Sequence, residues 1–435
     1  MRRNKILALL FSLATTVVFA QGSKLTIEDA VKIALEKNYD VLIYKNLSEK
    51  EKNNNTIGNA GMLPNIDLTG SYVNSTSNLK QQYNNSTEIN RDASGSTNAN
   101  VDAGLSWTIF DGMKMFHTKK KLDGNFYQSE QQLKLRMETT ISEVVNAYYT
   151  IIKNIQLLKA TEQEIRLLDE RLQLTDRKLN NGSGSKLDQM KAKIEFNRQK
   201  TIELTTITSI EEAKLNLNQL MARPLETTFT TEDTVIISFR PTVDEVKKSL
   251  TENNTIHFYE MNQRLAELSL KENQALRYPK IALTSHYLFN RSTNEAGFSL
   301  LNQAQGYNYG FTASLPLFHG FGINRQIKNA KLDVLNAKLQ FTSANEQVNA
   351  DLLNVFRNFS NSLLILQNEE ENILLANDVL NIAQERYRVG FSNSIELQDA
   401  FRSYEESVSR LTDARFNSKL METALRKISG KLISN

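Results

Sequence analysis

The side chains that most often carry enzymatic chemistry are scarce or scattered in this sequence. Its 435 residues contain no cysteine, and the four histidines (His117, His257, His286 and His319) never lie three or four positions apart. Thiol nucleophiles, Cys-ligated metals, disulfides and helical His-cage motifs are therefore excluded. No P-loop or G-x-G-x-x-G motif is present. The remaining candidates are carboxylates on helix surfaces, so we expect no enzyme, no cofactor and no resident metal.

The N-terminus is typical of a secretory signal peptide. Arg2, Arg3 and Lys5 precede an apolar run that ends before Ala20, where we expect cleavage. This run is too short to span a membrane easily, and no later apolar stretch reaches 18 residues. The mature chain therefore has no expected transmembrane helix, and any membrane-spanning part must consist of β-strands.

The overall composition favours long helices and gives no indication of a nucleic-acid partner. Lys plus Arg number 52 against 49 Asp plus Glu, and without residues 1–20 the two counts are equal. A nucleic-acid-binding surface has no support in this balance. The chain has only 5 Pro and 17 Gly, fewer than an all-β protein of this length needs for its turns.

The chain contains two copies of one plan. Similar blocks recur in the same order, 208 to 216 residues apart: 25–38 with 241–254, 62–72 with 277–287, and 106–112 with 314–320. Such ordered recurrence indicates internal duplication. We expect these segments: signal peptide 1–20; first repeat 21–223 with strands 63–78 and 99–111 and helical hairpin 116–222; linker 224–240; second repeat 241–435 with strands 278–290 and 307–318 and helical hairpin 322–430.

Two features define each repeat. Apolar and polar residues alternate along 99–111 and 307–318, as in a transmembrane strand with one face to lipid or in the half-buried strand of a soluble sheet. The segments 79–98 and 291–306 between the strands are rich in Asn, Ser, Thr and Gln and are expected to be surface loops. A heptad seam runs from Met137 to Leu179 and predicts a long coiled-coil helix that reverses at Gly182, with the equivalent reversal at Gly390.

The number of strands bears on assembly. Four strands per chain cannot close a barrel, and open strand edges are not tolerated in lipid. Eight strands enclose an interior filled by side chains, whereas twelve leave a lumen, so a conduit favours three chains. The expected fold is a mixed α/β membrane protein with internal duplication: four transmembrane β-strands per chain in a trimeric 12-stranded barrel, and long helical hairpins.

The segments LTIEDAVKIALEKN, LPNIDLTGSY, TIFDG and RVGFSNSIELQDAFRSYEES, in this order, resemble the TolC-like outer-membrane efflux protein family. The resemblance covers nearly the whole mature chain. It implies a homotrimer in the bacterial outer membrane, in contact with its lipid, with a helical tunnel in the periplasm. It also implies partners, a periplasmic adaptor protein and an inner-membrane transporter, with which the channel exports small molecules or proteins by an efflux or type I secretion route.

The resemblance also implies a gate at the periplasmic end. The family's gate tyrosine, turn glycine and two acids match Tyr387, Gly390, Glu396 and Asp399, and a gate aspartate of the first repeat matches Asp188. In a trimer, Glu396 and Asp399 would form two rings of carboxylates that favour cations. The alternative is that they begin a helix, where acids complement the dipole. The family's latch arginine is replaced by Ser392, with Arg388 and Lys186 as candidate substitutes.

Three classes of function follow. The first is a passive export duct whose energy comes from a partner pump. The second is a periplasmic adaptor, although adaptors usually carry one helical hairpin rather than two. The third is a structural coiled-coil envelope protein, which has no need for the duplicated alternating strands.

Overall fold

The structure of the chain is a computed structural model that describes residues 24–84 and 86–433. The expected signal peptide lies outside these residues. The elements run in this order: α1 (Ile27–Lys37), α2 (Tyr39–Asn54), β1 (Asn65–Gln82), β2 (Glu88–Phe110), α3 (Lys114–Asn180), α4 (Lys186–Leu220), α5 (Val243–Ser249), the 3₁₀ helix η1 (Leu250–Glu252), α6 (Asn254–Ala275), β3 (Lys280–Asn294), β4 (Leu301–Ser314), α7 (Gly322–Arg388) and α8 (Ser394–Ile428). The same succession of short helices, two strands and a long hairpin therefore occurs twice.

The compact units of the chain do not coincide with the two sequence repeats. One unit comprises Met1–Asn38, Thr140–Arg240 and Arg357–Ala424, and the other Tyr39–Thr139, Pro241–Phe356 and Leu425–Asn435. We call them the hairpin unit and the sheet unit. Each draws segments from both repeats, because the helices and strands of one copy pack against their counterparts in the other.

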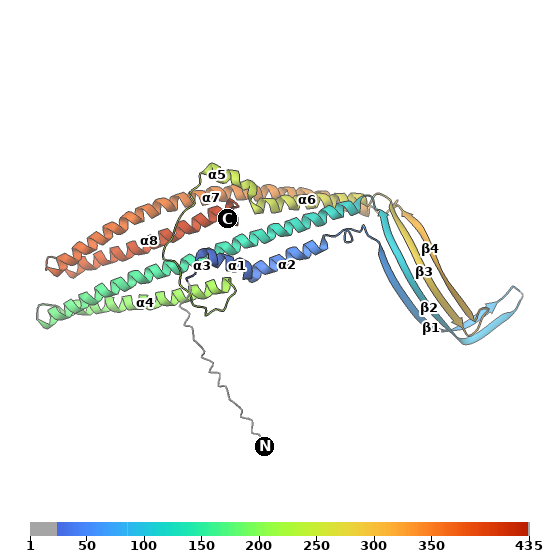
Figure 1. Cartoon of the computed structure of the whole chain (residues 1–435), viewed down its shortest axis with the longest axis horizontal. Coiled ribbons are helices and arrows are strands. Elements are labelled where there is room, and N and C mark those ends of the chain that lie inside the picture. Colours follow the sequence, from blue (N-terminus) through green and yellow to red (C-terminus); the bar gives the residue numbers. More distant parts are fainter. Residues whose placement is uncertain (1–23, 85, 434–435) are drawn as a thin grey trace, which may run out of the picture. The chain divides into compact units, whose positions relative to one another are not determined.

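The sheet unit holds one antiparallel sheet in the order β1-β2-β3-β4 (Figure 1). The register pairs Tyr72 with Ala99 and Tyr287 with Tyr307. Successive side chains alternate between faces, so Ile66, Leu68 and Tyr72 share one face, and all three are at least 70% exposed. Asp67 and Asp102 occupy the opposite face, where Asp102 contacts His286 of β3 with 3.1 Å between carboxylate oxygen and Nδ1.

The prediction of surface loops over 79–98 and 291–306 was wrong in extent, because the loops are shorter. β2 already begins at Glu88 and β4 at Leu301, so most of the polar residues belong to the ladder. Hydrogen bonds across β1 and β2 join Ser75 Oγ to Ser96 Oγ at 2.7 Å and Thr97 Oγ1 to Asn74 at 2.7 Å. Hydrogen bonds between backbone groups hold neighbouring strands together whatever their side chains are. Where both faces of a strand are polar, the sequence lacks the alternation of apolar and polar residues that predicts a strand.

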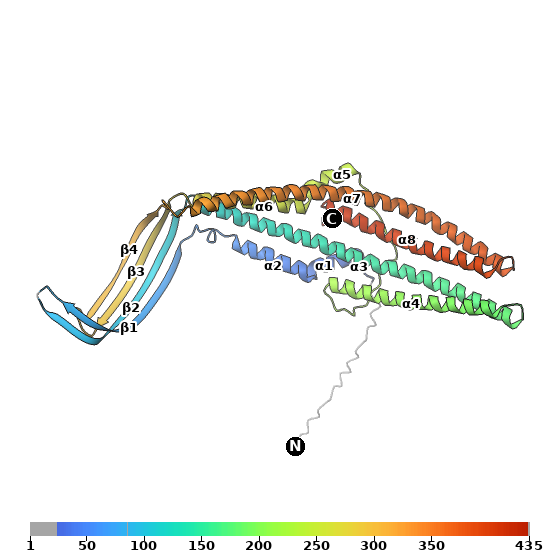
Figure 2. The same cartoon turned by 180° about the vertical axis from the view of Figure 1, so that it is seen from behind.

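Helices of the sheet unit pack in pairs that both views show side by side, α2 with α3 and α6 with α7 (Figures 1 and 2). Ser129 Oγ of α3 donates to Ser48 Oγ of α2 at 3.3 Å. From α6, Glu272 accepts hydrogen bonds from Thr118 and Lys121 of α3 at 2.8 and 2.9 Å. Leu265 of α6 lies against Gly124 of α3, where an added Cβ would come within 2.8 Å.

The hairpin unit has its core where α3, α4 and the linker meet. Val144, Tyr148 and Ile151 of the heptad seam are almost completely buried, together with Leu217 and Met221. The seam predicted from the heptad spacing is therefore the buried face of α3 along this stretch. It provides the hydrophobic stabilisation that a long helix cannot obtain alone.

Polar side chains of the helices hold the segment 224–240, which has almost no regular structure. Tyr148 Oη donates to Leu25 O at 2.8 Å and accepts from Glu232 N at 3.2 Å. On α8, the fully buried Glu422 accepts from Phe239 N at 2.8 Å and from Lys419 Nζ at 2.7 Å. Side chains of the helices thus form hydrogen bonds with backbone groups of a segment that has almost no secondary structure to pair them.

Candidate functional site

The turns of the two long hairpins share one construction. Gly182 and Gly390 adopt φ of +70° and +86°, a left-handed conformation that favours glycine. Each is followed by a backbone N–H that reaches back five residues, Ser183 to Lys178 O at 3.0 Å and Phe391 to Arg386 O at 2.9 Å. This is the Schellman pattern at a helix C-terminus. No atom of the described residues lies within 4 Å of a Cβ added at either glycine, so backbone conformation rather than space demands the residue.

Each returning helix begins with a side-chain cap. Ser185 Oγ accepts from Leu187 N at 3.1 Å, and Asn393 Oδ1 accepts from Ile395 N and Glu396 N at 3.0 and 2.9 Å. Asp188 and Glu396 lie in the first turns of α4 and α8. Their positions therefore also suit the helix dipole, as the alternative interpretation expected.

Tyr387 lies in an apolar cluster near the turn of α7 and α8. It is 8% exposed and packs with Leu380, Leu397 and Phe401, while Leu174 of α3 contacts the same cluster. Lys178 Nζ of α3 lies 4.7 Å from the centroid of its ring, within the range of a cation–π interaction. Tyr387 therefore connects the two hairpins through its ring.

The pKa of the Tyr387 hydroxyl is raised above its ordinary value. Burial raises the pKa of Tyr387, Arg171 lowers it, and the charge of Asp188 raises it further. The structure thus brings the expected pair Asp188 and Tyr387 within electrostatic range.

Glu396 is held by residues of the turn. Its Oε1 lies 3.3 Å from Arg386 Nε, and its Oε2 accepts from Ser392 Oγ at 2.7 Å. Asp399 lines a groove of about 550 Å³ together with Glu396, and in the part of the chain that the structure describes it forms no ion pair. The groove also exposes Val379 and Ile382.

The two basic residues singled out in the sequence lie elsewhere. Arg388 donates to Glu385 at 2.7 Å, and Lys186 donates to Gln189 at 2.6 Å. The arginine that contacts Glu396 is Arg386, which sequence reasoning missed. Its signal was available: it lies four residues before Gly390 and Glu396 six after, so a reversal at the glycine brings them together.

A second polar group, also missed in the sequence, joins α3, α4 and α8. We call it the α3–α4–α8 cluster, and it consists of Glu164, Glu195, Arg198, Gln199, Gln398 and Glu405. Gln398 Nε2 donates to Glu195 at 3.1 Å, and Arg198 donates to Glu405 at 3.4 Å. Burial is the main cause that raises the pKa of Glu164 to about 7, and the nearby charge of Glu405 adds to it. No spacing in the sequence signals this cluster, because its members are brought together only by the packing of three helices.

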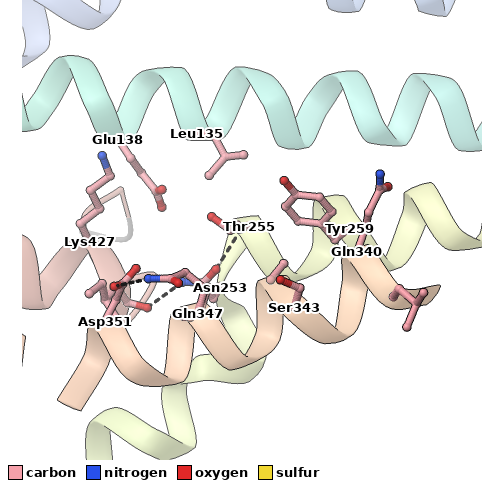
Figure 3. A pocket seen from close by; sticks show the side chains of 14 residues that line it. Leu135, Glu138, Asn253, Thr255, Tyr259, Gln340, Ser343, Gln347, Asp351 and Lys427 are labelled. Atoms are coloured by element: carbon pink, nitrogen blue, oxygen red, sulfur yellow. Dashed lines mark hydrogen bonds between the residues drawn. The ribbon is translucent and has the colours of Figure 1, made fainter. Parts of the chain in front are cut away.

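The sheet unit contains a cavity of about 710 Å³ beside the start of α6 (Figure 3). Leu135 and Glu138 of α3 face Tyr259 of α6 and Gln340 of α7 across it. Glu138 is 3% exposed and accepts from Asn254 Nδ2 at 2.7 Å. Burial raises its pKa, against smaller opposing effects of Asn254 and Lys427.

The described residues contain no group of three or more His, Asp or Glu side chains placed to hold a metal ion. Within residues 24–84 and 86–433, no helix is both long and apolar enough to cross a bilayer.

Comparison with known proteins identifies the class. The model of the family described as "Outer membrane efflux protein" matches residues 31–223 and 246–431. The chain belongs to this outer membrane efflux protein family, and the two matched segments confirm the internal duplication. It is an outer-membrane channel of an efflux or secretion system. The family consists of channels rather than enzymes. Membership in a family of channels also decides against the adaptor and structural coiled-coil alternatives.

Individual relatives agree with this assignment. The chain is 22% identical to outer membrane protein TolC of Escherichia coli strain K12, over 85% of this chain and 75% of TolC. It is 20% identical to the proteases secretion protein PrtF of Dickeya chrysanthemi, over 86% and 82% of the two chains. The crystal structure of the outer membrane protein VceC from Vibrio cholerae superposes with a TM-score of 0.79 at 16% identity, covering 93% of this chain and 96% of VceC.

Proposed function

We propose that three copies of the chain form a passive export duct, closed at the hairpin turns, which receives cargo from a periplasmic adaptor and an inner-membrane transporter. The observation that carries this proposal is the incomplete sheet of a single chain. Within the described part of the chain, β1 and β4 are its edges, each paired with one neighbouring strand. Open edges beside lipid leave backbone groups unpaired, so the edge of one copy must pair with that of the next.

The exposed side chains of the sheet support the same assembly. On β4, Tyr307, Tyr309 and Phe311 are each more than 70% exposed on one face, in line with the exposed apolar face of β1. Such an apolar band suits outer-membrane lipid, and the polar face with Asp102 and His286 suits a water-filled interior. Twelve strands from three copies provide that interior.

The helices also carry apolar surface that one chain leaves uncovered. Leu364, Leu374 and Ile382 of α7 are each more than 60% exposed, as are Ile194 and Leu204 of α4. Long amphipathic helices obtain their stability from packing, and neighbouring hairpins of a trimer supply the missing partners. The adaptor is a further candidate for part of this surface.

The gate assignment follows from the turns. Glu396 and Asp399 lie on one groove, and three copies would place two sets of carboxylates around a narrow passage that favours cations. In this proposal, Tyr387, Asp188 and the ion pair of Arg386 hold the closed state. In the same proposal the latch is assigned to Arg386 rather than to Arg388 or Lys186, and the contacts of these two side chains with Glu385 and Gln189 support that choice.

The absence of cysteine allows a direct test of the edge pairing. Cysteines at Ser71 in β1 and Asn308 in β4, joined by a short bis-maleimide in detergent, should give covalent dimers and trimers on a denaturing gel. Each single-cysteine variant is the matched control and should give no trimer. Light scattering of the unmodified protein should give three times the chain mass, and a planar bilayer should show small cation-selective openings. A monomer without conductance would contradict the duct.

A further inference from the structure

Glu164 and Gln199 form a buried pair with one hydrogen bond missing. Gln199 Nε2 donates to Glu164 Oε2 at 2.6 Å, and the two residues are 8% and 1% exposed. The other polar side-chain atom of Gln199, Oε1, is buried and has no hydrogen-bond partner among the residues that the structure describes. A protonated Glu164 carries an O–H that can donate to this oxygen after a small rotation, which an ionised carboxylate cannot do. The packing of α3 and α4 is therefore better satisfied by the neutral acid.

On balance, the surroundings of Glu164 oppose its ionisation. Burial, the largest effect, and the charges of Glu405 and Glu195 oppose it, while Arg198 and the hydrogen bond from Gln199 favour it. Arg198 is already shared, at 2.9 Å from Glu195 and 3.4 Å from Glu405. The charged groups that face this site are Arg171 from α3, Glu195 and Arg198 from α4, and Arg402, Glu405 and Glu406 from α8.

We propose that Glu164 is a proton-sensing residue that couples the packing of α8 against α3 and α4 to pH. When protonated, it completes its hydrogen bonds with Gln199 and leaves Arg198 to bind Glu405. When it loses its proton to solvent, through the cavity of about 530 Å³ that it lines, it repels Glu405 and competes for Arg198. The contacts between α4 and α8 then weaken.

This inference rests on the proposed duct, because α8 carries the gate acids Glu396 and Asp399 from its first turns. Loosening of α8 lowers the stability of the closed turns, so opening increases as pH rises. A group with a raised pKa stabilises the packed state at low pH and loses that effect as pH rises through its own pKa. Since the pKa of Glu164 is raised from 4.5 to about 7, this loss falls between those two values and is complete above the second.

The test compares single-channel recordings of the purified trimer at about pH 5 and about pH 8, values near the lower end of this window and above its upper end. The wild type should open several-fold more often at the higher pH. Glu164→Gln retains the shape and an amide donor without the charge, so it should stay mostly closed at both values. Glu170→Gln, on an exposed position of the same helix, is the matched control and should follow the wild type.

A second variant and a second readout separate this inference from the duct itself. Glu405→Gln removes the acid that an ionised Glu164 repels and with which it competes for Arg198, so opening should depend less on pH than in the wild type. Hydrogen exchange of α8 around Gln398 to Ser409, corrected for intrinsic rates, should accelerate with pH in the wild type and not in Glu164→Gln. A wild type that conducts with the same pH dependence as Glu164→Gln overturns the proton-sensing role. A protein that shows the exchange difference without conductance overturns only the duct.

Discussion

Arg386 and Glu396 form an ion pair across the turn between α7 and α8, with 3.3 Å between Nε and Oε1. The pair closes the reversal at Gly390 from both sides, since Arg386 lies in the last turn of α7 and Glu396 in the first turn of α8. Ser392 Oγ binds the other carboxylate oxygen at 2.7 Å. A serine and a displaced arginine therefore hold the acid at a turn where the family resemblance led us to expect a latch arginine.

The first prediction concerns this ion pair. Arg386→Ala should free the carboxylate of Glu396 and increase opening. Because the pair is about half exposed, its contribution should be at most about 1 kcal/mol, or roughly fivefold in the opening equilibrium per chain. Planar-bilayer recordings check the result, and 1 M salt should reduce the difference because it screens exposed charges. Arg388→Ala is the matched control, since among the described residues the side chain of Arg388 binds Glu385 and not Glu396. Equal effects of the two variants would argue against the assignment.

The second prediction separates the ring of Tyr387 from its hydroxyl. Tyr387→Ala removes a buried aromatic side chain, so it should destabilise the packed turn between α7 and α8 by about 3 kcal/mol or more. We expect faster hydrogen exchange at the start of α8 and longer channel openings. Tyr387→Phe keeps the packing and the contact with Lys178, so it isolates the hydroxyl. If Asp188 acts through that hydroxyl, Asp188→Ala and Tyr387→Phe should raise conductance equally. An Asp188→Ala channel that behaves as wild type would remove Asp188 from the gate.

Features repeated along the chain were the ones that the sequence revealed. The alternation from Val101 to Ile109 predicts β2, and the heptad spacing predicts a buried face at Val144, Tyr148 and Ile151. Both signals depend on regular periods within one element. The N-terminal half of β2 escaped this reasoning because its Asn, Ser and Thr side chains follow no period.

Contacts between distant segments were beyond the reach of sequence patterns. Glu164 and Gln199 lie 35 residues apart on helices that reverse between them, and Glu405 comes from the other repeat. Their juxtaposition depends on which faces of three helices meet, and one sequence does not specify that. The contact between Arg386 and Glu396 was easier to predict, because the turn at Gly390 alone brings the two residues together.

The third prediction concerns the anchor of the linker. Glu422 is completely buried and binds Phe239 N at 2.8 Å and Lys419 Nζ at 2.7 Å. Glu422→Ala removes the buried carboxylate that accepts from the backbone N–H of Phe239 and pairs with Lys419, whose hydrogen bonds among the described residues are then reduced to the one with Ile236 O. It should therefore lower the stability of the hairpin unit by about 3 kcal/mol. Thermal unfolding in detergent measures the loss, and limited proteolysis should cleave near Ser238. Glu406→Ala, at an exposed position of α8, should change neither.

The fourth prediction uses the pH dependence of stability in the sheet unit. Burial raises the pKa of Glu138 above its ordinary 4.5, so the folded state binds a proton that the unfolded state has already released. Stability from this group is therefore present at low pH and declines as pH rises from 4.5 through the folded pKa. Glu138→Gln keeps the contact with Asn254 without a titrating group, so the difference in unfolding temperature between variant and wild type should grow with pH. A constant difference would mean that Glu138 is not buried as a titrating acid. An increasing advantage for the wild type would mean that Lys427 stabilises its charged form.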